Sequence, residues 1–304
     1  MRADTRFRAM GTDIHVIAVA GRQRAAAAAL DRARERIDEL EALWSRFRPT
    51  SDISIANAMA GTSVRVSQET IALVQRAIDG YGLTEGRFDP TVLGAVVRAG
   101  YDRSYEQIRP EVQTSDARKF GAPLIEVDPI AGLMRLPEGV GFDPGGIGKG
   151  LAADIVVAEL LDRVDGICVN LGGDLRVAGQ APDDCGWVIS VEHPCGGPPH
   201  GDICIADGAV ATSSRTRRVL KDGGHHLIDP ATGRPAETSV LSSTVIAGQA
   251  WFAEVLAKAA FLAGPVDGPA LLASADAEGL LLLDDGTDVA SDGLGLFLLR
   301  KAAA

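Results

Sequence analysis

Residues 141–154 read GFDPGGIGKGLAAD, and no other stretch of the chain says as much about its architecture. An apolar lead-in ends at Asp143, a glycine-rich turn follows, and Lys149 stands where the apolar pattern of Leu151 to Leu161 predicts a helix. Glycines let the backbone approach a ligand closely, and a helix N-terminus presents free N–H groups to phosphate oxygens. The stretch therefore predicts a strand-to-helix turn that can bind an anion.

Two well-known phosphate-binding patterns do not describe this turn. It has neither the G-x-x-x-x-G-K-[ST] spacing of a Walker A loop nor the G-x-G-x-x-G spacing of a Rossmann turn. A glycine-rich turn around a solvated lysine is the simpler alternative, and these residues alone leave it open.

The composition is that of a globular protein with an acidic balance. The chain has 304 residues, 46% of them hydrophobic, and a formal net charge of −11. This length allows one large domain or two fused lobes. Nucleic-acid-binding proteins usually carry a basic patch or stripe, and none is visible, so we predict no nucleic-acid partner.

The apolar runs, the N-terminus and the cysteines carry the predictions about location. No run reaches the roughly 18 apolar residues of a membrane helix, and residues 1–4 lack both a signal-peptide core and a lipid-attachment cysteine. The four cysteines match no zinc pattern and need no disulfide framework. We expect a cytoplasmic protein with reduced thiols and no membrane partner.

Hydrophobic periodicity predicts strands interspersed with helices. Residues 23–44 carry an apolar stripe at helical spacing, and Ser67 would cap a second helix that runs through Ile78. The further elements are helices over 249–263 and 268–275, a polar surface segment over 101–122, and strands over 14–20, 124–128, 132–136, 167–171, 187–191, 203–206, 209–212, 240–247, 280–283 and 296–299. This order predicts an α+β fold or a mixed α/β sandwich.

Six further motifs surround the glycine-rich turn in a defined order. They are MGT at 10–12, SRFRPTSDISIAN at 45–57, GRFDPTV at 86–92, NLGGD at 170–174, ATS at 211–213 and HLIDPATG at 226–233. Together they resemble the ApbE-like family, the FAD:protein FMN transferases, over roughly residues 5–265. The resemblance implies one ApbE-like domain over 1–304. It also implies an α+β mixed sandwich of two related antiparallel-sheet lobes, with a flavin-binding cleft between them.

The resemblance implies FAD-binding roles for side chains on the flavin side of the cleft. Met10 would pack against or beside the isoalloxazine. Phe47 stands where the family often has tyrosine, so ring stacking would survive without the hydroxyl. Asn57 would offer a donor and an acceptor to a flavin edge. Core packing for Met10 and a turn or capping role for Asn57 are the alternatives.

On the nucleotide side, the resemblance implies that Phe88, Asp89 and Pro90 form part of the wall. Asp143 would accept a hydrogen bond from the ribose or the adenine, and Lys149 would meet the pyrophosphate. Phe88 as a core residue and Asp89 as a turn residue are the alternatives.

His226 is the candidate for acid–base chemistry. Cleavage of a pyrophosphate requires a proton to be taken from the attacking hydroxyl, or charge to be stabilised on the leaving phosphate, and an imidazole can do either. Asp229 would orient His226 or simply begin a turn, and His225 should face the other way into solvent. Thr212 and Ser213 would donate hydroxyls to phosphate.

The expected metal site departs from the family pattern. Family members hold Mg²⁺ with a carbonyl of the glycine-rich loop, here Gly146, and with an Asp and a Thr four residues apart on a late helix. Glu254 and Lys258 stand at those two positions. Glutamate can bind a hard cation, but lysine has no acceptor. We therefore expect the Lys258 ammonium to replace the metal, the alternative being a surface ion pair with Glu254.

Three functions remain open on the sequence. The first is transfer of FMN from FAD to a Ser or Thr of an acceptor flavoprotein with release of AMP, weakened or made metal-independent by Lys258. The second is hydrolysis of FAD to FMN and AMP. The third is an FAD-binding protein that has lost catalysis.

Overall fold

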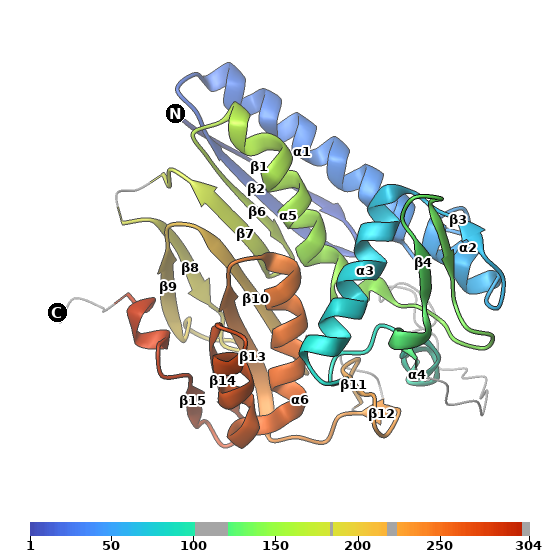
Figure 1. Cartoon of the computed structure of the whole chain (residues 1–304). Coiled ribbons are helices and arrows are strands. Elements are labelled where there is room, and N and C mark those ends of the chain that lie inside the picture. The colour runs from blue at the N-terminus through green and yellow to red at the C-terminus, as the bar shows by residue number, and fades with distance from the viewer. Residues whose placement is uncertain (101–120, 183–184, 218–223, 300–304) are drawn as a thin grey trace.

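An antiparallel sheet of eight strands runs through the molecule, in the order β1-β2-β6-β7-β10-β13-β14-β15 (Figure 1). The structure is a computed structural model that describes residues 1–100, 121–182, 185–217 and 224–299. The strands are β1 (Arg2–Ala9), β2 (Thr12–Val19), β6 (Gly166–Leu171), β7 (Asp174–Gly179), β10 (Gly208–Ser214), β13 (Val240–Ala247), β14 (Glu278–Leu283) and β15 (Asp288–Ala290).

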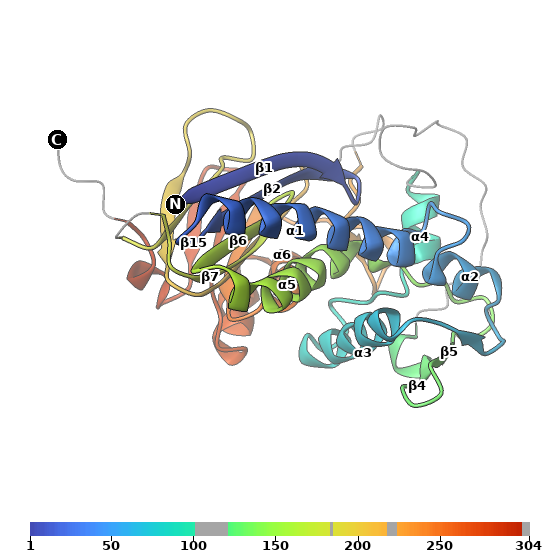
Figure 2. The ribbon, with the colours of Figure 1, turned by 90° about the horizontal axis from the view of Figure 1, so that it is seen from above.

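Helices cover one face of this sheet and a hairpin covers the other. Helices α1 (Gln23–Trp44), α5 (Gly148–Leu160) and α6 (Ala250–Ser274) form the first layer, and Figure 2 shows α1 and α5 on the same side of β1 and β2. Strands β8 (Trp187–Val191) and β9 (Gly201–Ile205) cover the opposite face through a second hydrophobic core. Because each strand alternates its side chains between the two faces, the same sheet contributes side chains to both hydrophobic cores.

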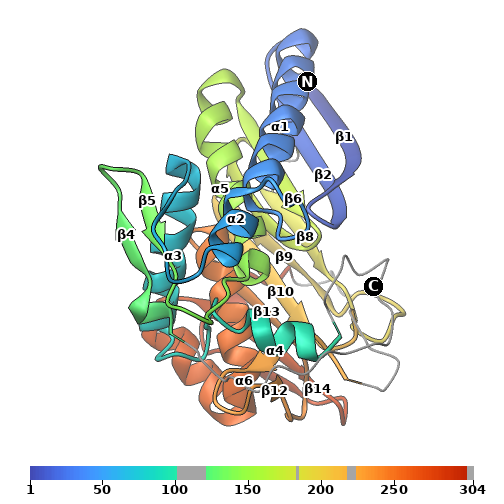
Figure 3. The same ribbon diagram turned by 90° about the vertical axis from the view of Figure 1, so that its right-hand side faces the viewer.

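A smaller group of elements extends from one end of the helix layer (Figure 3). It contains α2 (Asp52–Ala58), α3 (Gln68–Leu83), α4 (Leu93–Arg98) and a small sheet of β3 (Val64–Arg65), β5 (Leu133–Arg135) and β4 (Glu126–Asp128). The short elements that complete the described chain are β11 (Ile228–Asp229), β12 (Arg234–Pro235) and the 3₁₀ turns η2 (Ala122–Leu124), η3 (Pro144–Gly146), η4 (Leu161–Arg163) and η5 (Leu294–Leu296).

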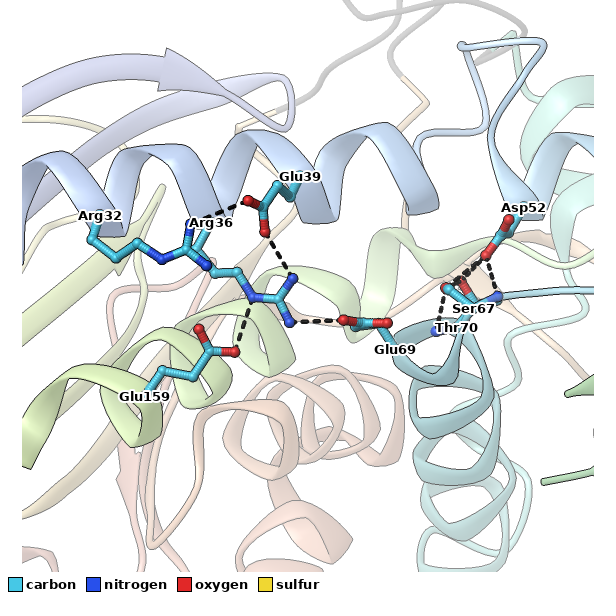
Figure 4. A network of polar contacts seen from close by, with 8 residues as sticks. All are labelled: Arg32, Arg36, Glu39, Asp52, Ser67, Glu69, Thr70 and Glu159. Atoms are coloured by element: carbon cyan, nitrogen blue, oxygen red, sulfur yellow. Dashed lines mark hydrogen bonds and ion pairs between the residues drawn. The ribbon is translucent and has the colours of Figure 1, made fainter. Parts of the chain in front are cut away.

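Arg36 of α1 ties this smaller group to the main layer (Figure 4). Its guanidinium donates to Glu39 on its own helix at 3.0 Å, to Glu69 at the start of α3 at 2.9 Å and to Glu159 near the end of α5 at 2.9 Å. The Arg36 side chain is only 14% exposed, so these bonds are partly shielded from water. One arginine therefore fixes the relative positions of three helices.

Helices α5 and α6 hold each other through a reciprocal pair of carboxylates. Asp154 of α5 accepts from the first two N–H groups of α6, those of Ala250 and Trp251, each at 2.9 Å. Glu254 of α6 accepts from the N–H of Gly150, in the first turn of α5, at 2.9 Å. Each helix therefore satisfies free N–H groups at the start of the other. Burial raises the pKa of Asp154 to about 6.

The predicted elements compare closely with the observed ones. The α+β class and the antiparallel sheets are confirmed. Strands from the N-terminal and C-terminal halves of the chain join one continuous sheet. Helix α1 has the predicted limits, and Ser67 caps α3 by accepting from the Thr70 N–H at 3.2 Å. The two predicted late helices form the single element α6, kinked at Gly264, where φ is 81°.

Some predictions were wrong. Helix α3 continues past Ile78 to Leu83, and residues 296–299 contribute only one isolated bridge, from Leu298 to Ile203, instead of a strand. Strand β1 was missed because its exposed charged side chains alternate with partly buried ones, as on a sheet edge. Most of the predicted surface segment, 101–120, lies outside the described residues.

Helix α6 also corrects the prediction that no segment reaches the length of a membrane helix. Within the described ranges it is the one helix that meets that length and composition. Half of its most apolar stretch is buried inside the protein, and it packs on β10 and β13. This packing is that of a core helix, and a core helix can have the same length and apolar composition as a helix that crosses a membrane.

The crossing of α5 and α6 leads to a first prediction. A Cβ added at Gly150 would lie 2.3 Å from the Ala250 carbonyl oxygen, so Gly150→Ala forces the helices apart. We expect a loss of about 1–3 kcal/mol or more in unfolding free energy, measured by urea titration.

Gly82→Ala is the matched control, because Gly82 is also helical and nothing lies within 4 Å of its added Cβ. This variant should be neutral or gain about 0.5–1 kcal/mol. Equal stabilities of the two variants would contradict the close approach.

Candidate functional site

One deep pocket, with a volume of about 360 Å³, lies where six segments of the chain converge. These are the β1–β2 turn, the end of α1 with residues 45–48, residues 87–96, the η3 turn with the start of α5, residues 226–230, and the middle of α6. Five of the seven sequence motifs therefore meet at one place, although they are spread over more than 200 residues.

The turn between β1 and β2 forms one wall. Met10 and Gly11 both have positive φ, 51° and 67°, and they join the paired residues Ala9 and Thr12. A two-residue turn of this kind matches the twist of the flanking strands, and glycine adopts it without strain. The turn places the partly buried Met10 side chain on the pocket wall.

A guanidinium and an aromatic ring form the wall after α1. The Arg46 guanidinium lies 4.3 Å from the centroid of the Phe47 ring, and its Nε is 3.6 Å from Asp143 Oδ1. The same Asp143 oxygen accepts from the Gly145 N–H at 3.0 Å and so caps the η3 turn. Phe47 is 46% exposed, which leaves ring surface for a flat ligand to stack on.

The segment after α3 is tied to the glycine-rich turn. Asp143 donates its N–H to the Pro90 carbonyl at 2.7 Å. Asp89 is buried and accepts from the N–H and the hydroxyl of Thr91 at 2.8 and 2.6 Å, and its burial raises its pKa. Asp89 thus serves as a turn residue, the alternative considered from the sequence, while it also lines the pocket.

Gly146 is packed too closely to carry a side chain. An added Cβ would lie 2.9 Å from Phe88 Cε2 and 3.0 Å from Lys258 Cε. The aliphatic part of Lys258 therefore lies directly over the Gly146 backbone, at the floor of the pocket. The glycine is required by this contact between α6 and the η3 turn.

Two ammonium groups and two carboxylates form a compact cluster beneath this floor. Lys149 donates to Glu254 Oε1 at 2.7 Å and also pairs with Asp174 Oδ2, and Lys258 Nζ lies 3.5 Å from the same Glu254 oxygen. The side chains of Asp174 and Glu254 are 6% and 1% exposed. The four charges cancel, which is the condition under which buried charges are tolerated.

The cluster perturbs the pKa values of its own members. Burial raises the pKa of Asp174 to about 6, against the opposing charge of Lys149. Burial would also raise the pKa of Glu254, but the charges of Lys149 and Lys258 outweigh it and lower that pKa. Burial lowers the pKa of Lys258. Burial would lower the pKa of Lys149 too, but Asp174 and Glu254 outweigh it and raise that pKa.

Most of the candidate residues predicted from the sequence line this pocket. They are Met10, Phe47, Phe88, Asp89, Pro90, Asp143, Gly146, Lys149, His226 and Lys258. The alternative of a solvated lysine at position 149 was wrong, because the Lys149 side chain is 19% exposed and paired with two carboxylates. The alternative of a surface ion pair between Glu254 and Lys258 was also wrong.

Five candidates do not line the pocket, and one of them is Glu254, which lies in the charge cluster beneath the pocket floor. Asn57 holds the Phe142 backbone through both ends of its amide, at 2.7 and 2.9 Å, which is a structural role. Thr212 pairs with Thr244 at 2.9 Å on the sheet face away from the helices, and Ser213 is buried. Asp229 accepts from the Ala231 N–H at 2.8 Å and so forms a turn.

Sequence reasoning missed two contributions to the site. Asp174 ends one of the quoted motifs. Side chains alternate along β7, so Asp174 points to the helix side of the sheet while its neighbour Leu175 points to the other side, and Asp174 reaches Lys149 there. This alternation was a usable signal. The second contribution is a set of arginines in the pocket lining: Arg46, Arg48 and Arg87. His225, expected in solvent, is buried instead.

Basic side chains outnumber acidic ones in the lining of the pocket, although the protein as a whole is acidic. Its lining contains the basic side chains Arg46, Arg48, Arg87, Lys149 and Lys258 against the acidic side chains Glu41, Asp89 and Asp143. Gly148 and Lys149, at the start of α5, also line the pocket and bring the positive end of a helix dipole to it. This arrangement suits an anionic ligand with a flat aromatic part.

Comparison with known proteins identifies the family. Residues 10–281 match the ApbE family. The chain belongs to this family. It is 29% identical over 280 residues to the FAD:protein FMN transferase of Vibrio cholerae, covering 87% of this chain and 83% of that protein. It is 30% identical over 268 residues to the FAD:protein FMN transferase of Treponema pallidum, covering 81% and 74%.

Solved structures of ApbE proteins have the same fold. The Thermotoga maritima ApbE protein superposes with a TM-score of 0.89 at 29% identity, over 99% of this chain and 100% of that one. The flavin transferase ApbE of Vibrio cholerae gives 0.83 at 26% identity, over 98% and 99%. The family resemblance predicted from the motifs is thus confirmed.

The buried cluster yields a second prediction, framed as a double-mutant cycle. Lys149→Met leaves two carboxylates facing one ammonium, so it should cost about 3–5 kcal/mol of unfolding free energy. Asp174→Asn should also destabilise, because two ammoniums then face one carboxylate. The double variant is neutral again and should cost clearly less than the sum of the singles, by urea titration. Additive costs would contradict the pairing of Lys149 with Asp174.

Proposed function

We propose that this chain binds FAD and transfers FMN from it to a Ser or Thr hydroxyl of an acceptor flavoprotein, releasing AMP. The observation that carries this proposal is the convergence of the α5 N-terminus, the Lys258 side chain and His226 on one pocket. The relatives in Vibrio cholerae and Treponema pallidum carry the name of this activity.

The pocket supplies contacts for both chemical parts of FAD. The exposed face of Phe47 beside Arg46, together with Met10, suits the isoalloxazine ring. The α5 N-terminus and Lys258 suit the pyrophosphate, because both bring positive charge to the pocket floor. Lys149 is shared by two carboxylates, so we assign it to holding the floor in place and Lys258 to the phosphate contact.

The reaction is a displacement at phosphorus. The acceptor oxygen forms a bond to the FMN phosphorus while the bond to the bridging pyrophosphate oxygen breaks, and AMP leaves with that oxygen. His226, on the pocket wall, takes the proton of the attacking hydroxyl. The protein otherwise contributes positioning and neutralisation of charge, which is most of what phosphoryl transfer requires.

The residues present do not fit the magnesium site that the family resemblance implied. Both oxygens of Glu254 already accept hydrogen bonds, from Lys149 at 2.7 Å and from the Gly150 N–H at 2.9 Å. The third position holds Lys258, which has no lone pair to offer. Within the described ranges, no group of three or more His, Cys, Asp and Glu side chains could hold a metal ion.

We therefore infer that the Lys258 ammonium supplies the counter-charge at the pyrophosphate, and that the activity does not depend on Mg²⁺. A single positive charge neutralises less than a divalent cation and does not bridge phosphate oxygens. A slower reaction than that of a metal-dependent relative is the expected consequence.

The third prediction tests the function directly. Purified protein, FAD and an acceptor flavoprotein are incubated, and covalent FMN on the acceptor is measured by mass spectrometry with AMP by chromatography. We expect both products in equal amounts. His226→Ala should lower the rate by about 10²–10⁴ and leave FAD affinity unchanged, because a general base is lost.

His193→Ala serves as the control, since His193 lies in the β8–β9 loop and does not line the pocket. FMN and AMP formed equally well without the acceptor would instead identify a hydrolase. Tight FAD binding without either product would identify a binding protein. Absence of saturable FAD binding would refute the proposal altogether.

The fourth prediction concerns the metal. The wild-type rate should be the same in EDTA and in Mg²⁺. Replacing Glu254 by Asp and Lys258 by Thr introduces oxygen ligands beside the Gly146 carbonyl, so transfer by this double variant should rise on addition of Mg²⁺. Lys258→Thr alone is the comparison variant. A wild-type rate that falls in EDTA would show that Lys258 does not replace the metal.

A further inference from the structure

Two adjacent histidines face opposite ways at the edge of the pocket. His226 lines the pocket, whereas His225 is 7% exposed and points into a separate hydrophobic cluster. Its ring meets the ring of Phe261 edge-on, with the centroids 5.9 Å apart and the planes at 87°. Phe261 belongs to α6, one turn after Lys258.

Both nitrogens of His225 are engaged with the backbone. Nδ1 lies 3.3 Å from the Leu227 N–H, which can only donate, and Nε2 lies 3.1 Å from the Ala236 carbonyl, which can only accept. Only the neutral ring with its hydrogen on Nε2 satisfies both contacts. Burial lowers the pKa of His225, in agreement with a neutral ring.

These contacts hold the segment that carries His226. Leu227 and Ala236 are themselves joined, since the Ala236 N–H donates to the Leu227 carbonyl at 2.9 Å. They stand at the open end of the β11–β12 hairpin, where Ile228 pairs with Pro235. His225 therefore binds both ends of this hairpin and rests on α6, with His226 as the next residue.

We propose that His225 is a positioning residue that fixes His226 relative to Lys258 by clamping the β11–β12 hairpin against α6. This inference rests on the function proposed above, since it concerns the general base of that reaction. Such a clamp sets the distance between the group that takes the proton and the cation that meets the phosphate. Displacement of a catalytic group by about 1 Å can cost about 100-fold in rate.

Three substitutions separate the contacts of His225. His225→Phe keeps a ring against Phe261 and removes both hydrogen bonds. His225→Asn keeps an acceptor near the Leu227 N–H, and His225→Gln places an amide donor near the Ala236 carbonyl. His200→Phe is the matched control, because His200 lies on the β9 side of the sheet and pairs with Asp288.

The experiment measures kcat, KM for FAD, the FAD dissociation constant, the melting temperature, and the ¹H–¹⁵N correlations of the His226 ring. In His225→Phe we expect kcat to fall about 10- to 100-fold, with the FAD dissociation constant within about twofold and the His226 signals shifted. His225→Gln or His225→Asn should recover part of kcat, whereas His200→Phe should change nothing.

Each other outcome has a defined meaning. An unchanged kcat in His225→Phe overturns the proposal, as does a loss of kcat, FAD affinity and melting temperature that is equal in all three variants. A wild-type protein that does not cleave FAD refutes the proposed function instead. The His226 signals then decide the clamp alone: a shift in His225→Phe supports it, and unshifted signals overturn it.

Discussion

The reciprocal carboxylate contact between α5 and α6 is the interaction on which the rest of the site depends. Asp154 satisfies the start of α6, and Glu254 satisfies the start of α5. The helices approach so closely at Gly150 that no other residue fits there. Because this crossing is fixed, the glycine-rich turn, Lys149 and Lys258 arrive at the same place. The position of the pocket floor thus follows from the way in which α5 and α6 cap one another.

Glu254 contributes both to the packing of two helices and to the charges beneath the pocket floor. The same side chain that accepts from the α5 backbone also pairs with Lys149 and faces Lys258. Removing a carboxylate from such a position leaves buried charges without partners, which costs far more than the loss of one hydrogen bond. The two ammonium groups are for this reason balanced by two carboxylates, and Asp174 is the second of these carboxylates.

Local patterns in the sequence predicted local structure well. The apolar stripe of residues 23–44 gave the limits of α1, because this helix buries one continuous face. The β-branched and apolar run at 240–247 gave those of β13, because this strand is buried on both faces. Long-range pairing was harder to predict. Lys149 meets Glu254 across 105 positions, and Asn57 meets Phe142 across 85, and no spacing rule links such residues. The motif resemblance brought the right segments together, but it assigned Asn57 to a ligand, whereas the structure shows its amide bonded to the Phe142 backbone and outside the pocket lining.

The balance of the four buried charges also constrains how this site can change over generations. Glu254 and Lys258 stand on one helix face, and substituting either one alone leaves a largely buried charge without its partner. The two positions are therefore coupled, since the side chain tolerated at one depends on the side chain present at the other. We expect changes at this site to involve both positions together.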